Sequence, residues 1–459
     1  MMTVGLLATD ASAQQGGERI YEEELRVSFD QQRPWARENT VDFGAWFNVA
    51  WMNFDDAGAQ RNRTLRQYQI RPWASMNLKG VHQAYLRGII AWDDWNRGDN
   101  PTWWRESEFE DTIERAWYSF DLGQLLSSQA GKPLPWGARV KVGRQYTTIG
   151  SALTLATPLD AVRFDVNAWN WQFMSFLGKT PKHSRNIDLS PAIPDQERCM
   201  YGFQLTYRGL TYHRPFAYYF AQFDHSSPNP GVAPGAFQRY DYSTRYAGIG
   251  STGTLFLRDL SYVVELAGEW GDTYSQWQTA SQDSVCAMAF DLQLEYLFRV
   301  KTHPRVSFEY LYGSGDSDRG LSSVTTLGGN RPSTRDEAFN GFGFRDTGIA
   351  YSPRISNLHM LSFGAKFLPL EDRELFRKLE VGTRVYAYVK DKNASPTSDP
   401  TAYVDAQWLG WEWDVFMNWR ITSDLSATMR YGCFQPGAAY EEPFDTARHF
   451  VYAGVTLSL

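Results

Sequence analysis

The sequence predicts an all-β protein, a transmembrane up-and-down antiparallel β-barrel of about 18 strands. Three observations carry that prediction. Apolar and polar residues alternate from position 41 onward, connection lengths sort into two classes, and aromatic residues make up 15% of the 459 residues. Aromatic side chains at that density are typical of interfaces, where one end of the ring is apolar and the other is wet.

Alternation is clearest between positions 409 and 421, where polar residues such as Glu412 and Asp414 share one face. The other face is apolar: Leu409, Trp411, Trp413, Val415, Met417, Trp419 and Ile421. The same criterion gives eighteen strand cores: 41–53, 64–76, 81–93, 109–121, 136–146, 160–168, 170–180, 196–208, 214–225, 239–251, 257–271, 284–298, 303–315, 358–370, 377–391, 406–421, 425–436 and 448–459.

Connections after even-numbered strands are mostly short, and those after odd-numbered strands are mostly long and polar. The long ones are 94–108, 181–195, 226–238, 272–283, 316–357 and 392–405. Barrels of bacterial outer membranes have short periplasmic turns and longer extracellular loops, whereas a soluble sandwich has no reason to sort its loops in this way. The segment 122–135 departs from the scheme, because it is long where a short turn is expected.

The ends of the chain are consistent with export to a bacterial outer membrane. We interpret residues 1–13 as part of a signal peptide, because Ala11-Ser12-Ala13 has the small-residue form of a cleavage site. The alternative is the disordered N-terminus of a soluble protein. Residues 14–40 would form a periplasmic lead-in, and residues 41–459 the barrel, whose last strand alternates up to Leu459.

Composition excludes two other classes. No run approaches the ~18 consecutive apolar residues of a membrane helix, and a net charge of -7 argues against a nucleic-acid partner. Three cysteines lie far apart without metal-ligand spacing. We predict no cofactor and no metal; Asp316 and Asp318 are weak candidates for Ca²⁺, since the remaining ligands of the EF-hand pattern are absent.

Two motifs would suit an enzyme, and neither is strong. Gly248–Gly253 matches GxGxxG, but another strand rather than a helix follows, so we interpret it as a glycine-rich periplasmic turn. Asp224-His225-Ser226-Ser227 is the one His-Ser cluster beside an acid, and a hydrolase would require these groups to converge around an oxyanion hole. We therefore predict that the protein is not an enzyme.

If apolar side chains face lipid, the alternate positions face the lumen. Eight arginines then point inward: Arg71, Arg87, Arg115, Arg163, Arg245, Arg305, Arg384 and Arg430. Carboxylates fall on the same face, including Glu265, Glu269, Glu309 and Glu412. Two interpretations stay open: a lattice of mutually neutralising charges, or a subset of arginines that converges at a constriction and selects anions.

Several short motifs, in their order along the chain, resemble the alginate-export outer-membrane porins. They are Ile70-Arg71-Pro72-Trp73-Ala74, Arg115-Ala116-Trp117, Val142-Gly143-Arg144-Gln145, Ile355-Ser356-Asn357-Leu358 and Met429-Arg430-Tyr431-Gly432. The resemblance implies a monomeric barrel whose basic lumen passes an anionic uronate polymer. By position it implies pore-lining roles for Arg71, Arg115, Arg144 and Arg430, and for Arg345 and Arg354 near the arginines that precede strand 14.

Arg144 departs from this scheme, because it has the parity of Val142 and simple alternation aims it at lipid. The function predicted from the resemblance is a channel for an alginate-like exopolysaccharide, with outer-membrane lipid and periplasmic secretion components as further partners. The alternatives are a porin that takes up small anionic solutes or oligosaccharides, and a non-transporting surface barrel whose loops bind a partner. The sequence leaves the polymer, the direction of transport and the gating loops open.

Overall fold

The computed structural model describes residues 39–100, 107–182, 184, 186–188, 196–226, 241–255, 259–273, 282–326, 330–331 and 333–459. Eighteen strands account for most of them: β1 (Thr40–Asp56), β2 (Arg61–Leu78), β3 (His82–Trp95), β4 (Ser107–Asp121), β5 (Trp136–Ile149), β6 (Leu155–Ala168), β7 (Trp171–Lys179), β8 (Arg198–Tyr207), β9 (His213–Asp224), β10 (Tyr242–Thr254), β11 (Leu260–Thr273), β12 (Asp283–Leu297), β13 (Arg305–Gly313), β14 (Leu358–Phe367), β15 (Leu379–Val389), β16 (Trp408–Arg420), β17 (Leu425–Pro436) and β18 (Arg448–Ser458). Helix α2 (Leu122–Ala130) and the 3-10 turn η2 (Glu374–Phe376) lie between strands.

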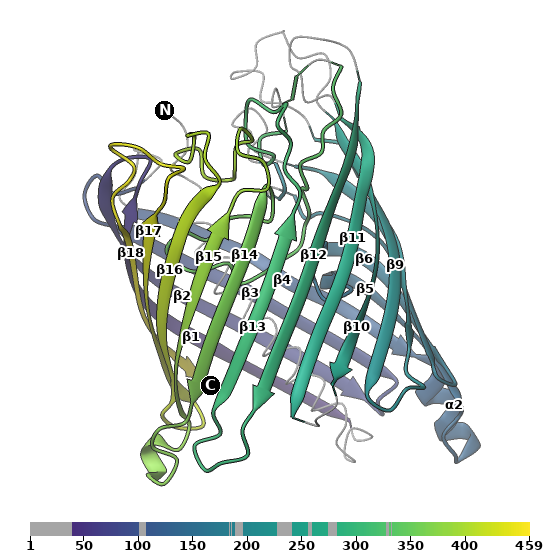
Figure 1. The fold of residues 1–459 in the computed structure, drawn as a ribbon. Helices are drawn as coiled ribbons and strands as arrows, with labels where there is room; N and C mark the ends of the chain where they lie inside the picture. The colour runs from purple at the N-terminus through teal and green to yellow at the C-terminus, as the bar shows by residue number, and fades with distance from the viewer. Residues whose placement is uncertain are drawn as a thin grey trace.

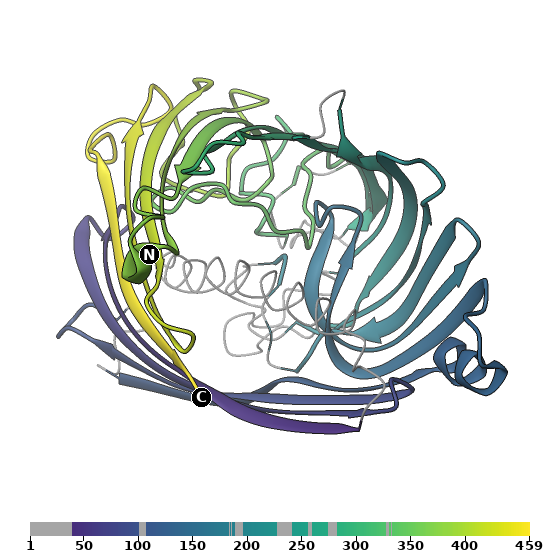
Figure 2. The ribbon, with the colours of Figure 1, turned by 90° about the horizontal axis from the view of Figure 1, so that it is seen from below.

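The strands form one closed antiparallel sheet in which each pairs with its neighbours in sequence. The ring closes at β1, where Ala50 lies opposite Gln67 of β2 on one side and Gly454 of β18 on the other. Figure 2 shows this ring along the barrel axis. The predicted up-and-down barrel and its strand number are confirmed.

Alternation sorts side chains between the two faces of the wall. On β1, Val49 and Trp51 are 53% and 41% exposed on the outer face, whereas Ala50 and Met52 are buried inside. The predicted apolar outer face of this strand is therefore confirmed. Among the described residues, no helix is long and apolar enough to span a membrane.

Connection lengths differ between the two rims as predicted. Figure 1 shows α2 and η2 at the lower end, which we call the turn rim, and the long connections at the upper end, which we call the loop rim. Helix α2 explains why 122–135 is long for a turn. Its N-terminus is capped by Asp121, whose carboxylate accepts the N–H of Gln124, and Gly131 ends it in the left-handed conformation, with φ 66°.

A β-bulge makes one outer-face prediction wrong. Tyr388 of β15 lies opposite Gly410, but Val389 lies opposite Trp408, so Leu409 is the extra residue. Leu409 is fully buried inside the barrel, and Trp408 takes a place on the outer face. A bulge shifts the alternation by one residue, and the apolar pattern of this strand did not reveal it.

Strand β10 corrects two further predictions. Gly248–Gly253 lies within β10 and is not a turn. A Cβ at Gly248 or Gly250 would overlap the rings of Tyr218 and Phe216 on β9, which explains glycine there. The tyrosines of β10 are buried inside, so Arg245, predicted to face the lumen, is exposed on the outer face.

Arginine placed on each face of β3 tests the assignment of the two faces. Leu86 is 50% exposed on the outer face and Gln83 is half-buried on the inner one. Because the sequence predicts lipid outside and water inside, Leu86→Arg should lower the free energy of unfolding in lipid vesicles by up to about 2–4 kcal/mol, as arginine near the bilayer midplane does. Gln83→Arg is the control and should change it far less. Equal losses in urea titrations of the two variants would contradict the assignment.

Candidate functional site

The longest connection, 314–357, folds into the barrel and fills part of its interior. Its backbone pairs with the β5–β6 connection, where the N–H of Phe342 donates to Thr154 at 2.9 Å and that of Phe344 donates to Ala152 at 3.0 Å. Phe339 is fully buried among side chains of the wall. Figure 2 shows green segments of this connection inside the ring. The loop-rim half of the lumen is therefore occupied along this side.

Glu412 of β16 binds backbone N–H groups of the connection 314–357, which we call the descending connection. Its carboxylate, fully buried, accepts the N–H groups of Ile349, Ala350 and Tyr351 at 2.6, 2.7 and 2.8 Å. Hydrogen bonds to a charged acceptor are about twice as strong as neutral ones. Three consecutive donors on one carboxylate fix the position of this segment against the wall.

Two glutamates of β11 hold neighbouring segments in the same way. Glu269 accepts the N–H of Asn340 at 2.9 Å and the hydroxyls of Tyr242 and Tyr246 at 2.7 and 2.9 Å. Glu265 accepts the Tyr218 hydroxyl at 2.7 Å and the N–H of Ser151 in the β5–β6 connection. We refer to Glu265, Glu269 and Glu412 as the latch glutamates.

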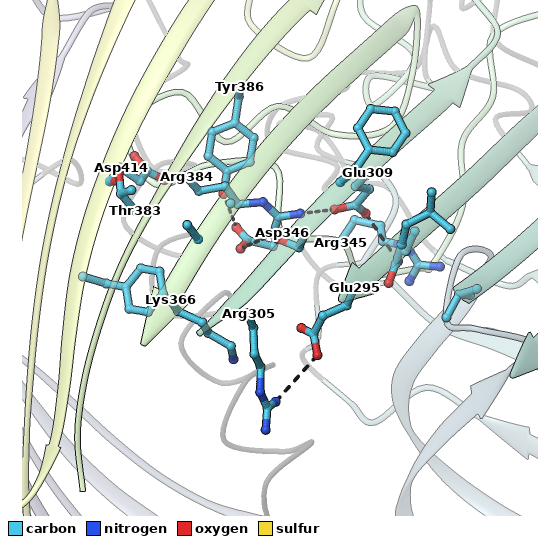
Figure 3. A pocket seen from close by; sticks show the side chains of 18 of the residues that line it. Glu295, Arg305, Glu309, Arg345, Asp346, Lys366, Thr383, Arg384, Tyr386 and Asp414 are labelled. Carbon is cyan, nitrogen blue, oxygen red and sulfur yellow. Dashed lines mark hydrogen bonds and ion pairs between the residues drawn. The ribbon is translucent and has the colours of Figure 1, made fainter. Parts of the chain in front are cut away.

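Below the connection, a cavity of about 520 Å³ opens in the wall formed by β11–β17. Figure 3 shows Arg384 between Glu309 and Asp346. Its guanidinium forms ion pairs with both carboxylates, at 2.6 Å and 3.2 Å respectively. Further toward the turn rim, Arg305 lies 3.6 Å from Glu295. The charged residues that line this cavity are Glu295, Arg305, Glu309, Arg345, Asp346, Lys366, Arg384, Asp414 and Arg430. Cations and carboxylates alternate here, as the lattice interpretation predicts.

Arg345 belongs to the descending connection and forms the roof of that cavity. Its guanidinium lies 2.8 Å from Asp291 and donates to the carbonyl of Ser151 at 2.7 Å. Burial alone would lower the pKa of Arg345, but the nearby carboxylates of Asp291, Glu265 and Glu309 outweigh burial and raise that pKa above its usual value. The arginine stays charged, and its hydrogen bonds hold the connection in place.

On the other side of the lumen, the wall formed by β2–β5 carries more cations than carboxylates in its half near the turn rim. At a bulge in β4, Glu114 is the extra residue, and it lies 3.2 Å from Arg71 and 2.7 Å from Arg87. Arg115 follows it, opposite Arg87, with its guanidinium 5.8 Å from the ring centroid of Tyr146. One carboxylate is thus shared between two arginines beside a third.

Two more cations follow on β5, closer to the turn rim. Arg139 lies 2.8 Å from Asp121, and the ammonium of Lys141 lies 4.0 Å from the ring centroid of Trp117. We define the basic wall as Arg71, Arg87, Arg115, Arg139 and Lys141. In this half of β2–β5 the five cations face two inward carboxylates, Glu114 and Asp121. Glu110 and Asp93 lie higher on the same wall, toward the loop rim.

The structure divides the six predicted arginines into separate places. Arg71 and Arg115 belong to the basic wall, and Arg430 and Arg345 line the opposite cavity. Arg354 donates to the carbonyl of Asn186 at 3.0 Å, between two connections of the loop rim. Arg144 lies on the outer face, where its Nε and Nη2 donate to the two carboxylate oxygens of Asp160 at 2.8 and 3.0 Å.

The other candidates have partners within the protein. Asp316 is buried and accepts the N–H groups of Asp318 and Glu337 at 2.8 and 3.2 Å. Asp318 lies 3.6 Å from Arg331. In the part of the chain that the structure describes, no three His, Cys, Asp or Glu residues are grouped as metal ligands. Asp224 forms a fully buried ion pair with Arg198 at 3.1 Å.

Sequence reasoning placed the latch glutamates inside the barrel but did not assign them a role, because alternation says nothing about the path of a long connection. Arg139 and Lys141 were missed altogether. Their parity, opposite to that of Val140 and Val142, is the signal that could have found them.

Comparisons with known proteins agree with this architecture. Residues 155–454 match the family described as Alginate export. The chain is similar to Pseudomonas aeruginosa OpdO, with 11% identity, a TM-score of 0.55, and coverage of 91% of this chain and 97% of that one. It is also similar to Acinetobacter baumannii OccAB1, with 9% identity, a TM-score of 0.53, and 91% and 97% coverage. These identities show the fold alone, and no curated protein matches the sequence.

Releasing the connection from Glu412 should widen the lumen. Glu412→Ala removes the acceptor of three backbone N–H groups, and a hydrogen bond to a charged group contributes about 1.5–3 kcal/mol. We expect a higher single-channel conductance in planar bilayers. Glu374→Ala, at an exposed position of η2, is the control and should leave conductance unchanged. An unchanged conductance of a correctly folded Glu412→Ala barrel would contradict the latch.

Proposed function

This chain belongs to the alginate-export family, and on that premise we propose that its barrel passes an anionic, alginate-like polysaccharide along the basic wall. The protein is a channel of the bacterial outer membrane. In such barrels the short turns face the periplasm, so the turn rim is the periplasmic one. The basic wall then lies in the periplasmic half of the lumen.

The excess of positive charge on the basic wall is the observation that carries this proposal. Five cations face two carboxylates there, whereas the charges of the opposite cavity are nearly balanced. Arginine suits a uronate chain because its charge is fixed and its planar fork binds a carboxylate with two hydrogen bonds. A barrel of this size encloses an aqueous channel. Arg71, Arg115 and Arg139 are half-buried on its inner face, so a passing anion can reach them, whereas Arg87 is buried beside Glu114.

Export from the periplasm fits the distribution of open space. The cavity and the basic wall lie toward the periplasmic rim, and the descending connection closes the loop-rim half beside them. A polymer would therefore meet the basic wall first and the latched connection second. Residues 1–38 lie outside the residues that the structure describes. We further propose that residues 1–13 belong to a signal peptide, that residues 14–40 form a periplasmic lead-in, and that periplasmic secretion components are partners of the channel.

A porin for small anionic solutes is the second candidate. The cavity of about 520 Å³ under Arg345 favours it, because that volume suits a small molecule better than a chain. The two candidates differ in the effect of the latch. Release of the connection should be required for passage of a polymer, whereas a small solute should pass the latched barrel.

Neutralising the basic wall tests the proposal. Arg71, Arg87 and Arg115 replaced together by Gln lose three positive charges at similar side-chain length. The reversal potential across a salt gradient should move toward cation preference, with partial shifts for single replacements. The attraction acts over a screening length of ~10 Å at 0.1 M salt, so the wild-type preference for anions should weaken as salt rises.

Arg245→Gln is the matched control, because this arginine is exposed on the outer face and should not affect selectivity. A wild-type channel that prefers cations, or that is indifferent to charge, would contradict the proposal.

A further inference from the structure

Two arginines lie opposite each other at the turn rim, on either side of the turn that joins β8 to β9. The ladder between these strands ends with Thr206 opposite Phe216, and the same register, continued by two residues, brings Arg208 opposite Arg214. Both arginines are exposed. We call Arg208 and Arg214 the mouth pair.

Both members of the mouth pair belong to the lumen side of the wall. Arg214 has the parity of Phe216, which is buried inside the barrel. The guanidinium of Arg208 donates through Nη2 to Oε1 of Gln172, which lies opposite Thr206 on the inner face of β7. A solute that enters from the periplasm would therefore meet two guanidinium groups at the edge of the lumen.

No carboxylate partner compensates the charge of the mouth pair within the part of the chain that the structure describes, where neither guanidinium forms an ion pair. Arg163 of β6 differs, because it lies 2.8 Å from Asp165. The polar residue opposite Arg214 on β10 is neutral, Thr252. Partial desolvation and the positive charge of Arg214 lower the pKa of Arg208 below its usual value, so the two charges act on each other.

Backbone contacts hold the two arginines together. The N–H of Arg208 donates to the carbonyl of Asn170 at 2.7 Å, and the carbonyl of Tyr212 accepts the N–H of Thr254 at 2.9 Å. The turn is thus anchored on β7 at one end and on β10 at the other. Like charges directly opposite each other destabilise a sheet, and an anion bound between the guanidinium groups would remove this repulsion.

We propose that the mouth pair is an anion-binding site that captures a carboxylate of the uronate chain at the periplasmic entrance, before the chain reaches the basic wall. Arginine binds a carboxylate with two parallel hydrogen bonds. Two positive charges at an entrance also attract an anionic chain from solution and raise its rate of entry. This inference rests on the proposed function and adds to it the site where the polymer first binds.

The rate of current block by a soluble oligouronate tests the mouth pair. The ligand is added to oriented channels in planar bilayers, on the turn-rim side in one series and on the loop-rim side in another. Replacing Arg208 and Arg214 together by Gln should lower the association rate constant from the turn-rim side by about tenfold, the lower end of electrostatic steering effects. Each single replacement should give a smaller fall, and the rate from the loop-rim side should not change.

Arg299→Gln is the matched control. Arg299 lies at the same rim, in the connection between β12 and β13, but pairs with Asp259 at 2.8 Å. The control removes one positive charge, as each single variant does, and should change the rate far less. Lysine at both positions of the mouth pair keeps the charges and should retain most of the rate. A heat-modifiable band on gels shows that each variant is folded.

The outcomes separate this inference from the proposed function. If the double variant is blocked from the turn-rim side as fast as wild type, if block slows equally from both sides, or if Arg299→Gln slows it as much, the mouth pair is wrong and the anionic channel stands. If the double variant slows block from the turn-rim side only, while replacing Arg71, Arg87 and Arg115 leaves ion selectivity unchanged, the mouth pair stands and passage along the basic wall is wrong. If the oligouronate does not block the wild-type channel from either side, both are wrong.

Discussion

A closed ladder of backbone hydrogen bonds is the constraint on which the rest of this molecule depends. Within a bilayer every backbone N–H and C=O must be paired inside the protein, and a sheet satisfies this only when its first and last strands meet. Here β1 pairs with both β2 and β18. Once the ring is closed, side chains alternate between lipid and lumen, and polar groups can lie only inside, at the rims or in outer-face ion pairs such as Arg144–Asp160.

Inside the ring, charged groups on the two sides of the lumen differ in burial and in their partners. Against β10–β17, carboxylates such as Glu412 are fully buried and would be costly there without partners, and the backbone N–H groups of the connection supply those partners. On the basic wall cations are in excess, and all of its charged side chains except Arg87 are half-buried and keep contact with water. Burial therefore makes one set structural anchors, whereas the other set lines the path that we propose for the anion.

The sequence sufficed for the barrel, its strand number and most inward positions, because a period of two is written locally in each strand. It failed where the period is interrupted. Leu409 is an extra residue at a bulge. In β10 the tyrosines and glycines do not form a clear apolar and polar alternation, so the sequence did not show which face carries Arg245. The candidate site could be predicted less well from the sequence. Its contacts, such as that of Phe342 with the β5–β6 connection, join segments that are far apart in the chain.

The bulge in β4 shows how a single extra residue builds the basic wall. Before it, Ile113 lies on the outer face, and after it Tyr118 does, at 50% and 43% exposure, so the parity of the strand changes at Glu114. Glu114 and Arg115 consequently both point inward, and Trp117 follows them. Strict alternation through Glu114, without the bulge, would turn Arg115 and Trp117 toward lipid, where an arginine is costly. The bulge thus brings Arg115 and Trp117 into the lumen beside Glu114, the carboxylate that lies between Arg71 and Arg87.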